Sequence, residues 1–278
     1  MENNNLLTVV KTLFPECSGN KLKKIISSGR ITVNNEICRQ AARIIAPDEK
    51  ISVLSRSFRR HAIDENVIIE YEDNDLLIIN KPSGLLSVPD NSGLKSARDI
   101  CAVYLASVRK HKNLYIVHRL DRDASGLMLF AKNHNTQKAL IALFTGHFIM
   151  RQYTAWVEGS LEQENGKIDT YIFKDENTFR VSVCGAEKEG AKRAITGYHV
   201  LACKNNFSLC EITLETGRKN QIRVHMAHIG HAVCGDRMYG SKSSYRLLLH
   251  AHRLFFRHPV NGKMLDIKSA LPDDFVNP

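Results

Sequence analysis

Two stretches near the start of the chain have apolar residues at helical spacing. The pattern over residues 6–13 predicts one helix, which Pro15 ends. A second helix is expected over residues 18–27, with Ser18 as its N-terminal cap. Segments typical of short strands follow at residues 30–33, 36–38 and 50–54. This order predicts a small α/β unit at the beginning of the chain.

From residue 67 onward, segments typical of strands outnumber those typical of helices and follow one another directly. Strands are expected at residues 67–71, 76–80, 150–157, 168–184, 194–215 and 247–256, and helices at residues 97–108, 136–144 and 220–228. Strands that are consecutive in the chain tend to pair as neighbours. We therefore expect an α+β fold, with a largely antiparallel mixed sheet and flanking helices.

The most informative pattern lies at residues 115–132, where two apolar runs enclose a cluster of charges. Ile116–Val117 and Leu127–Ala131 are typical of buried strands, and residues 124–126 of a turn. Asp121 is then placed on a charged loop between Arg119 and Arg122. Neighbouring guanidinium groups favour an ionised carboxylate, which suits a nucleophile or an electrostatic stabiliser. The alternative is a solvated hairpin turn.

The segment His118-Arg119-Leu120-Asp121-Arg122-x-x-Ser125-Gly126-Leu127 resembles the signature of the RluA-type pseudouridine synthases. Residues 75–85, 153–159 and 217–225, the last followed by Gly235-Asp236 and Tyr239-Gly240, resemble the other motifs of that family, in its order. The likeness covers roughly residues 65–275. Four ordered matches favour the enzyme over the solvated turn, since one motif alone is a weak signal. The resemblance implies the pseudouridine synthase fold.

The resemblance also implies roles for individual residues. Asp121 corresponds to the catalytic aspartate, and Arg223 to its arginine partner. Tyr153 corresponds to the tyrosine that stacks on the uracil and helps to remove its ring proton, and Arg119 to the residue that enters the RNA where the base leaves. The sequence departs from the usual pattern at Asn220 (commonly His), Ala124 (commonly Thr) and Arg151 (often Lys). None of these positions is assigned to the chemistry. We therefore expect these departures to affect recognition of the nucleotides that flank the target uridine.

The implied reaction breaks a glycosidic bond, turns the uracil and forms a carbon–carbon bond. No electrons or groups leave overall, so we expect no cofactor and no metal. The target base must be flipped out of its stack, and an arginine can hold the vacated space because its plane stacks on bases. RNA is therefore the expected partner, and Arg122 and Arg218 are further candidate RNA-binding residues beside the site.

The net charge of +10 is concentrated near the N-terminus, where residues 1–60 hold eleven Lys or Arg and five Asp or Glu. Two helices and a small sheet with a basic second helix resemble the S-four-type RNA-binding domain. We assign residues 1–54 to this domain, 55–64 to a basic linker and 65–278 to the catalytic domain. Clustered positive charge suggests a phosphate-binding face. Its candidate RNA-binding residues are Lys21, Lys23, Lys24 and Arg30.

The composition is that of an ordinary globular protein, with 43% hydrophobic and 24% charged residues. No apolar stretch approaches the ~20 residues of a membrane span. The seven cysteines include no Cys-x-x-Cys pair, and their odd number argues against a disulfide framework. These features, together with an N-terminus that lacks a secretion signal, predict a cytoplasmic protein. We expect a monomer.

Several alternatives stay open at this stage. Large-subunit ribosomal RNA is the favoured substrate, and transfer RNA is the second choice. A non-catalytic RNA-binding or ribosome-assembly protein would share the basic face, and a glycosidase would need a pair of carboxylates that the sequence does not identify. His225, His228 and His231 are spaced as metal ligands on a helix would be, but Gly230 is expected to end that helix before the third.

Overall fold

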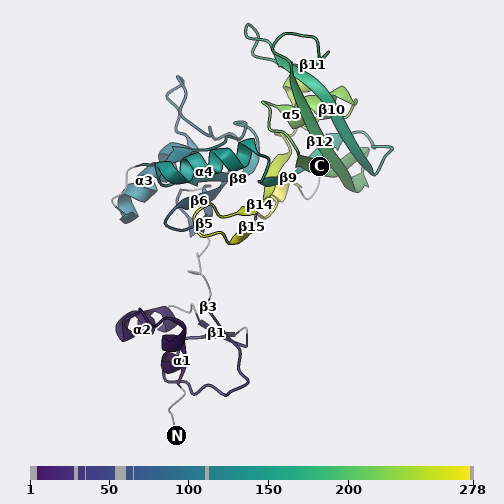
Figure 1. Cartoon of the computed structure of the whole chain (residues 1–278). Helices are drawn as coiled ribbons and strands as arrows, with labels where there is room; N and C mark the ends of the chain where they lie inside the picture. Colours follow the sequence, from purple (N-terminus) through teal and green to yellow (C-terminus); the bar gives the residue numbers. More distant parts are fainter. Residues whose placement is uncertain are drawn as a thin grey trace. The chain divides into compact units, whose positions relative to one another are not determined.

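The computed structural model describes residues 5–27, 31–34, 36–53, 61–64, 66–109 and 113–275. The chain forms two compact units, Met1–Arg59 and Arg60–Pro278, which are considered separately (Figure 1). Arg30 and most of the proposed linker lie outside the described residues.

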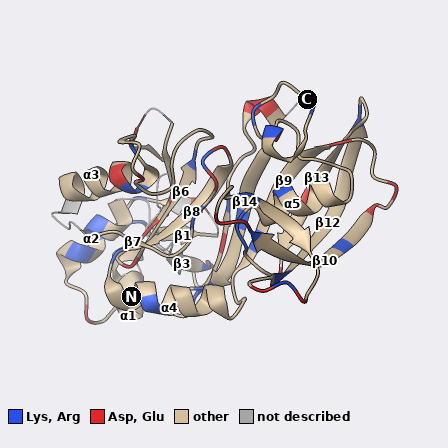
Figure 2. Ribbon diagram, turned by 90° about the horizontal axis from the view of Figure 1, so that it is seen from above, with Lys and Arg blue, Asp and Glu red and all other residues tan. Residues whose placement is uncertain are grey.

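The first unit pairs two helices with a three-stranded antiparallel sheet. Its elements are α1 (Leu6–Leu13), α2 (Gly19–Ser27), β1 (Ile31–Val33), β2 (Glu36–Cys38) and β3 (Ile51–Val53), with β1 in the middle of the sheet. Leu6, Leu22 and Ile31 are fully buried together because each helix turns its apolar stripe inward. The basic residues of α2 are all lysines, Lys21, Lys23 and Lys24, and all three are exposed (Figure 2).

The second unit is built on one long mixed sheet. In spatial order it contains β11 (Val181–Cys184), β10 (Asn165–Lys174), β12 (Lys192–Lys204), β13 (Phe207–Leu214), β9 (Met150–Glu158), β14 (Leu249–Arg257), β8 (Ser125–Ala131), β6 (Leu76–Lys81), β5 (Ile68–Glu72) and β4 (His61–Ala62). β15 (Met264–Lys268) pairs with β14, and β7 (Tyr115–Ile116) pairs with β8. Helices α3 (Ala97–Arg109), α4 (His134–Thr145) and α5 (Gln221–His228) accompany the sheet, as do the short 3-10 helices η1 (Arg237–Tyr239) and η2 (Asp273–Phe275). The predicted α+β class is confirmed.

Strand β8 lies at the centre of this unit and is buried along its whole length. Among the strands that the structure describes, every pairing is antiparallel except that of β8 with β14. This parallel junction has only two register pairs, His250 with Ser125 and Ala251 with Gly126. A Cβ atom on Gly126 would lie 2.3 Å from the Ala251 carbonyl oxygen, so the junction requires glycine.

The turn predicted at residues 124–126 is wrong by two positions. The chain turns at Arg122 and Asp123, and Ser125 already belongs to β8. The glycine that suggested a turn serves the close contact with β14 instead. Asp121 therefore lies on a loop that directly precedes the central strand.

Candidate active site

A small pocket of about 70 Å³ brings together the residues to which the sequence motifs point. Asp121 and Arg119 reach it from the loop before β8, Tyr153 from β9, and Arg223 from α5. Arg218 lines the same pocket from the segment before α5. The three predicted catalytic residues, which are far apart in the sequence, thus share one cavity at the middle of the sheet.

The Asp121 carboxylate is bound by the guanidinium group of Arg223. Arg223 Nη1 donates to Asp121 Oδ2 at 3.0 Å, and its Nε and Nη2 donate to Asp236 at 2.6 and 2.8 Å. The side chain of Asp236 is 0% exposed, that of Arg223 13% and that of Asp121 29%. The bidentate bond to buried Asp236 fixes the plane of Arg223 and leaves one nitrogen aimed at the more exposed carboxylate.

Arg223 remains charged in this setting. Burial alone lowers the pKa of its guanidinium, but the hydrogen bond and charge of Asp236, followed by the charge of Asp121, raise it above its ordinary value. The Asp121 carboxylate is therefore next to a permanent positive charge. It keeps partial access to the pocket, as a group that reacts with a substrate must.

Tyr153 presents a phenol to the same pocket from a buried strand. Burial raises the pKa of its hydroxyl, the charge of Arg151 lowers it, and the charge of Asp121 raises it, with a net shift upward. The hydroxyl therefore stays protonated at neutral pH. A neutral aromatic ring with one mobile proton is suited to stack on a base and to transfer a proton.

The loop that carries Asp121 is fixed by hydrogen bonds from a buried lysine. Lys81 is 0% exposed, and its Nζ donates to the carbonyl oxygens of Pro82, Leu85 and Arg122 at 2.8–2.9 Å. Burial lowers the pKa of the Lys81 ammonium to about 7, although Asp123 and Asp121 raise it. Three carbonyl partners use all three donors of the ammonium, so Lys81 ties this loop to the segment after β6.

Two further contacts fix the same loop. Ser87 Oγ donates to the Leu120 carbonyl at 2.6 Å and accepts from the Leu120 amide at 3.1 Å. His118 Nε2 accepts from the Leu129 amide at 2.9 Å. Accepting this bond requires an unprotonated nitrogen, and burial, with the charge of Arg151, lowers the pKa of His118 to about 3.

Sequence reasoning missed three supporting residues, Lys81, Ser87 and Asp236. Lys81 and Asp236 lie inside the segments that resemble family motifs, and this was the available signal. No pattern marks their burial, because a lysine or an aspartate in a turn segment is normally solvated.

The remaining predicted RNA-binding residues that the structure describes lie on the surface. Arg119 is exposed beside the pocket. Arg122 is exposed and pairs with Asp123 at 3.0 Å. Arg218 Nε donates to the Arg193 carbonyl at 3.2 Å. The α2 lysines Lys21, Lys23 and Lys24 are exposed in the first unit.

Two of the three histidines considered as metal ligands, His225 and His231, have separate hydrogen-bond partners. His225 is buried, and its ring nitrogens lie 2.9 and 3.1 Å from the hydroxyls of Thr196 and Thr170. Burial, with the charge of His228, lowers the pKa of His225 to about 4. His231 Nδ1 lies 2.8 Å from the Glu158 carbonyl oxygen. These contacts give His225 and His231 structural roles.

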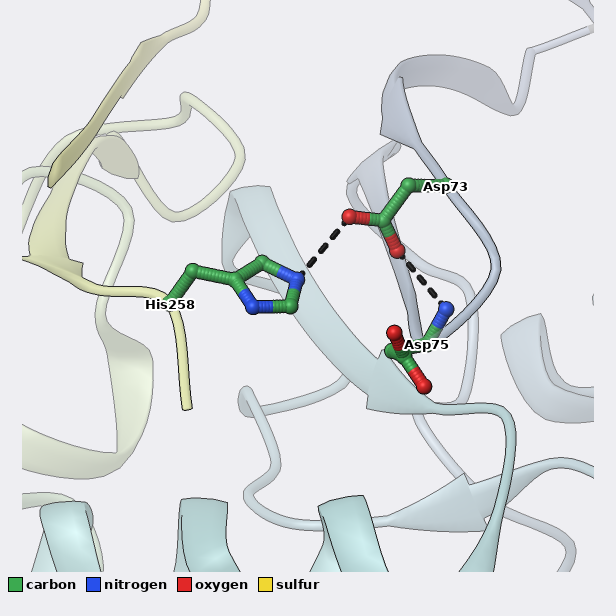
Figure 3. Close-up of side chains that lie close together, drawn as sticks. All are labelled: Asp73, Asp75 and His258. Atoms are coloured by element: carbon green, nitrogen blue, oxygen red, sulfur yellow. Dashed lines mark hydrogen bonds and ion pairs between the residues drawn. The ribbon is translucent and has the colours of Figure 1, made fainter. Parts of the chain in front are cut away.

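Another cluster, Asp73, Asp75 and His258, has the composition of a cation site (Figure 3). His258 Nδ1 accepts from two backbone amides, so its proton lies on Nε2, which donates to Asp73 Oδ2 at 2.9 Å. Asp73 also accepts from the Tyr71 hydroxyl and from the amides of Asp75 and Leu76. The imidazole has no free lone pair for a metal. The cluster joins the turn after β5 to the segment after β14.

Within the described residues, no helix combines the length and apolar character needed to cross a bilayer.

Comparison with known proteins gives concordant matches. A family model described as RNA pseudouridylate synthase matches residues 75–228. The chain is 34% identical to a Zymomonas mobilis protein named ribosomal large subunit pseudouridine synthase D, over 95% of this chain and 89% of that protein. It is 32% identical to a Bacillus subtilis protein named uncharacterized RNA pseudouridine synthase YlyB, over 93% and 88% respectively.

The solved structure of human RNA pseudouridylate synthase domain containing 4 is similar to this chain with a TM-score of 0.64. The similarity covers 75% of this chain and 90% of that chain at 24% identity. At this identity the similarity shows a shared fold.

Proposed function

The chain belongs to the RNA pseudouridylate synthase family, of the RluA type, and is an RNA pseudouridine synthase; on this basis we propose that it modifies large-subunit ribosomal RNA, with the Asp121 carboxylate acting on the ribose of a flipped uridine. Family membership confirms the reaction class that the motifs predict. The assignment of individual residues and of the RNA rests on the arguments below.

One observation carries the assignment of Asp121. Its carboxylate is bonded to a largely buried, charged arginine and lines the pocket that Tyr153 also lines. Arg223 is itself held by a second carboxylate, so it orients Asp121 before any substrate arrives. Preorganisation of this kind lowers the cost of reaching the reactive geometry.

The residues divide the reaction into three tasks. Arg119, exposed at the pocket, occupies the space that the flipped uridine leaves in the RNA. Asp121 acts beside the ribose, either by attacking the anomeric carbon or by removing a neighbouring proton, and the glycosidic bond to N1 breaks. The detached uracil turns against the Tyr153 ring, and C5 bonds to the anomeric carbon, displacing Asp121 on the route in which Asp121 has bonded there. The C5 proton is then lost with the help of the phenol and N1 takes up a proton, so that the product is an isomer of the substrate.

Two features support a ribosomal RNA substrate. The Zymomonas mobilis relative carries that substrate in its name. In addition, a hollow of about 560 Å³ shares Arg218 with the small pocket and is lined by Lys192 and Lys219, and by Lys174, which pairs with Glu176 of the same lining. Cationic side chains beside the site suit the phosphates of an extended RNA substrate.

The experiment that tests the proposed substrate is a map of pseudouridines in cells with and without this gene. We expect at least one pseudouridine of large-subunit ribosomal RNA to disappear on deletion and to return when the gene is restored. If only pseudouridines of transfer RNA disappeared, transfer RNA would replace ribosomal RNA as the proposed substrate.

We also propose that the first unit is an S-four-type RNA-binding domain that contacts the same RNA. Its helix α2 exposes Lys21, Lys23 and Lys24 beside an apolar face that is buried in the unit. Lysines that project from a packed helix are suited to contact phosphates without disturbing the fold.

Replacing Lys21, Lys23 and Lys24 together by Gln in the full chain should weaken RNA affinity while the rate of the bound complex stays unchanged. Each lost phosphate contact should reduce the slope of log K against log salt by roughly 0.8. Binding titrations at several salt concentrations measure the slope, and single-turnover assays measure the rate. An unchanged slope would show that these lysines of α2 do not contact RNA phosphates.

A further inference from the structure

Asn220 lies at the entrance to α5 in an uncommon backbone conformation. Its φ is +53°, in the left-handed region, and it is the residue immediately before the helix. An asparagine in this position normally caps the helix, but within the described residues its side chain makes no capping bond. The residue is only 9% exposed and lines the pocket that holds Asp121.

The neighbours of Asn220 fix the orientation of its amide. On one side is the Asp121 carboxylate, which can only accept hydrogen bonds. On the other is the Tyr239 hydroxyl, which already accepts from the Val181 amide at 3.3 Å and so has its own proton to donate. The amide nitrogen therefore faces Asp121 and the amide oxygen faces Tyr239.

In this orientation Asn220 Nδ2 lies 3.2 and 3.1 Å from Asp121 Oδ1 and Oδ2, and its oxygen accepts from Tyr239 Oη at 3.1 Å. The Tyr239 ring in turn packs 5.1 Å from the Arg223 guanidinium group. Asp121 is thus contacted by two separate donors, Arg223 at Oδ2 and Asn220 across both oxygens.

We propose that Asn220 is a positioning residue, whose amide, oriented by Tyr239, fixes the rotation of the Asp121 carboxylate for the reaction. The inference rests on the proposed function of Asp121. Arg223 alone binds one carboxylate oxygen and leaves the carboxylate free to rotate about its Cβ–Cγ bond. A second donor on the same group removes that freedom, and because an amide does not titrate, this contact is independent of pH. The charged or titratable groups around it are Arg119, Asp121, Tyr153, Arg218 and Arg223 of the pocket, and Tyr239.

Asn220→Gly provides the test variant, because glycine accepts a positive φ without strain while the amide is lost. Asn206→Gly is the matched control. Asn206 has φ +61° at an exposed turn between β12 and β13, so the two substitutions make the same chemical change in the same backbone region. The substrate is transcribed large-subunit ribosomal RNA that carries tritium at C5 of uridine, which is released when C5 bonds to the sugar.

Asn220→Gly should reduce the single-turnover rate of tritium release by about 10- to 100-fold, the effect expected from loss of a hydrogen bond to a charged group. RNA affinity should stay near that of the unchanged protein. Asn206→Gly should leave both quantities unaltered. A rate within about threefold of wild type for Asn220→Gly, or a loss confined to RNA affinity, would overturn the proposal.

Asn220→Asp gives a readout that a purely structural role would not change. The new carboxyl would meet the Asp121 carboxylate, and two like charges this close favour sharing one proton. Its rate should be lowest at high pH and should recover as the pH falls, relative to wild type at each pH. A pH profile of Asn220→Asp that runs parallel to that of wild type would contradict the proposal. If wild-type protein released no tritium, the proposed function and this inference would both fail, whereas a wild-type rate with unaffected variants would refute the inference alone.

Discussion

Asp121→Asn is expected to reduce the rate of pseudouridine formation by at least about a thousandfold, while RNA affinity stays within several-fold of wild type. The amide oxygen of asparagine can still accept the bond from Arg223, now 3.0 Å from the carboxylate, so the pocket keeps its shape. The negative charge is lost, and with it the capacity to attack the sugar or to take a proton. Single-turnover assays with saturating protein, together with equilibrium binding, separate the two quantities.

Asp123→Asn is the natural control for this change. Asp123 lies two residues away on the same loop, is half exposed and pairs with Arg122. Its substitution should leave the rate close to wild type, because Asp123 does not line the pocket and its charge is paired with Arg122. Full turnover by Asp121→Asn would refute the assignment of Asp121. Equal losses from both variants would point to a general effect of charge on the loop.

Asp236→Asn should both destabilise the protein and reduce its activity. Asp236 is fully buried and accepts two hydrogen bonds from Arg223. Without its charge, the largely buried guanidinium group of Arg223 has no strong partner on that side, a change that typically costs about 3 kcal/mol. Arg223 would also be freer to leave Asp121. A denaturant titration measures the stability, and the single-turnover rate measures the loss of alignment.

Asp169→Asn is a control that separates the effect of burial from the effect of a two-nitrogen hydrogen-bond geometry. Asp169 also binds an arginine through two nitrogens, Arg193 Nε at 2.9 Å and Nη2 at 2.6 Å, but this pair is exposed to solvent. Water and ions screen an exposed pair, so the free energy of unfolding, measured by the same denaturant titration, should change far less than for Asp236→Asn. Similar losses from the two variants would show that burial is not the source of the effect.

The sequence was most informative about local structure. Helical spacing located α1 and α4 within two residues at each end, because a helix is defined by contacts between near neighbours. β15 was missed, since its alternating, partly exposed residues depend on the neighbouring β14 for their structure. The parallel contact of β8 with β14 was also missed, because no local pattern encodes pairing between residues 125 and 250.

The candidate site also divides into features that the sequence predicted and features that it did not. The predicted grouping of Asp121, Tyr153 and Arg223 came from resemblance to a family, and the shared pocket agrees with it. Spacing alone would not have paired Asp121 with an arginine 102 positions away. The supports around them depend on burial, which gives Lys81 and Asp236 their importance and is a property of the folded chain.

The parallel contact between β8 and β14 has a consequence for how activity is acquired during folding. Asp121 precedes β8, whereas Tyr153 and Arg223 come from elements on the far side of that contact. Neither half of the sheet therefore holds a working centre by itself. Contacts between distant parts of a chain generally close late, since a long loop must first lose its freedom. Regain of catalysis after dilution from denaturant should accordingly lag behind recovery of secondary structure.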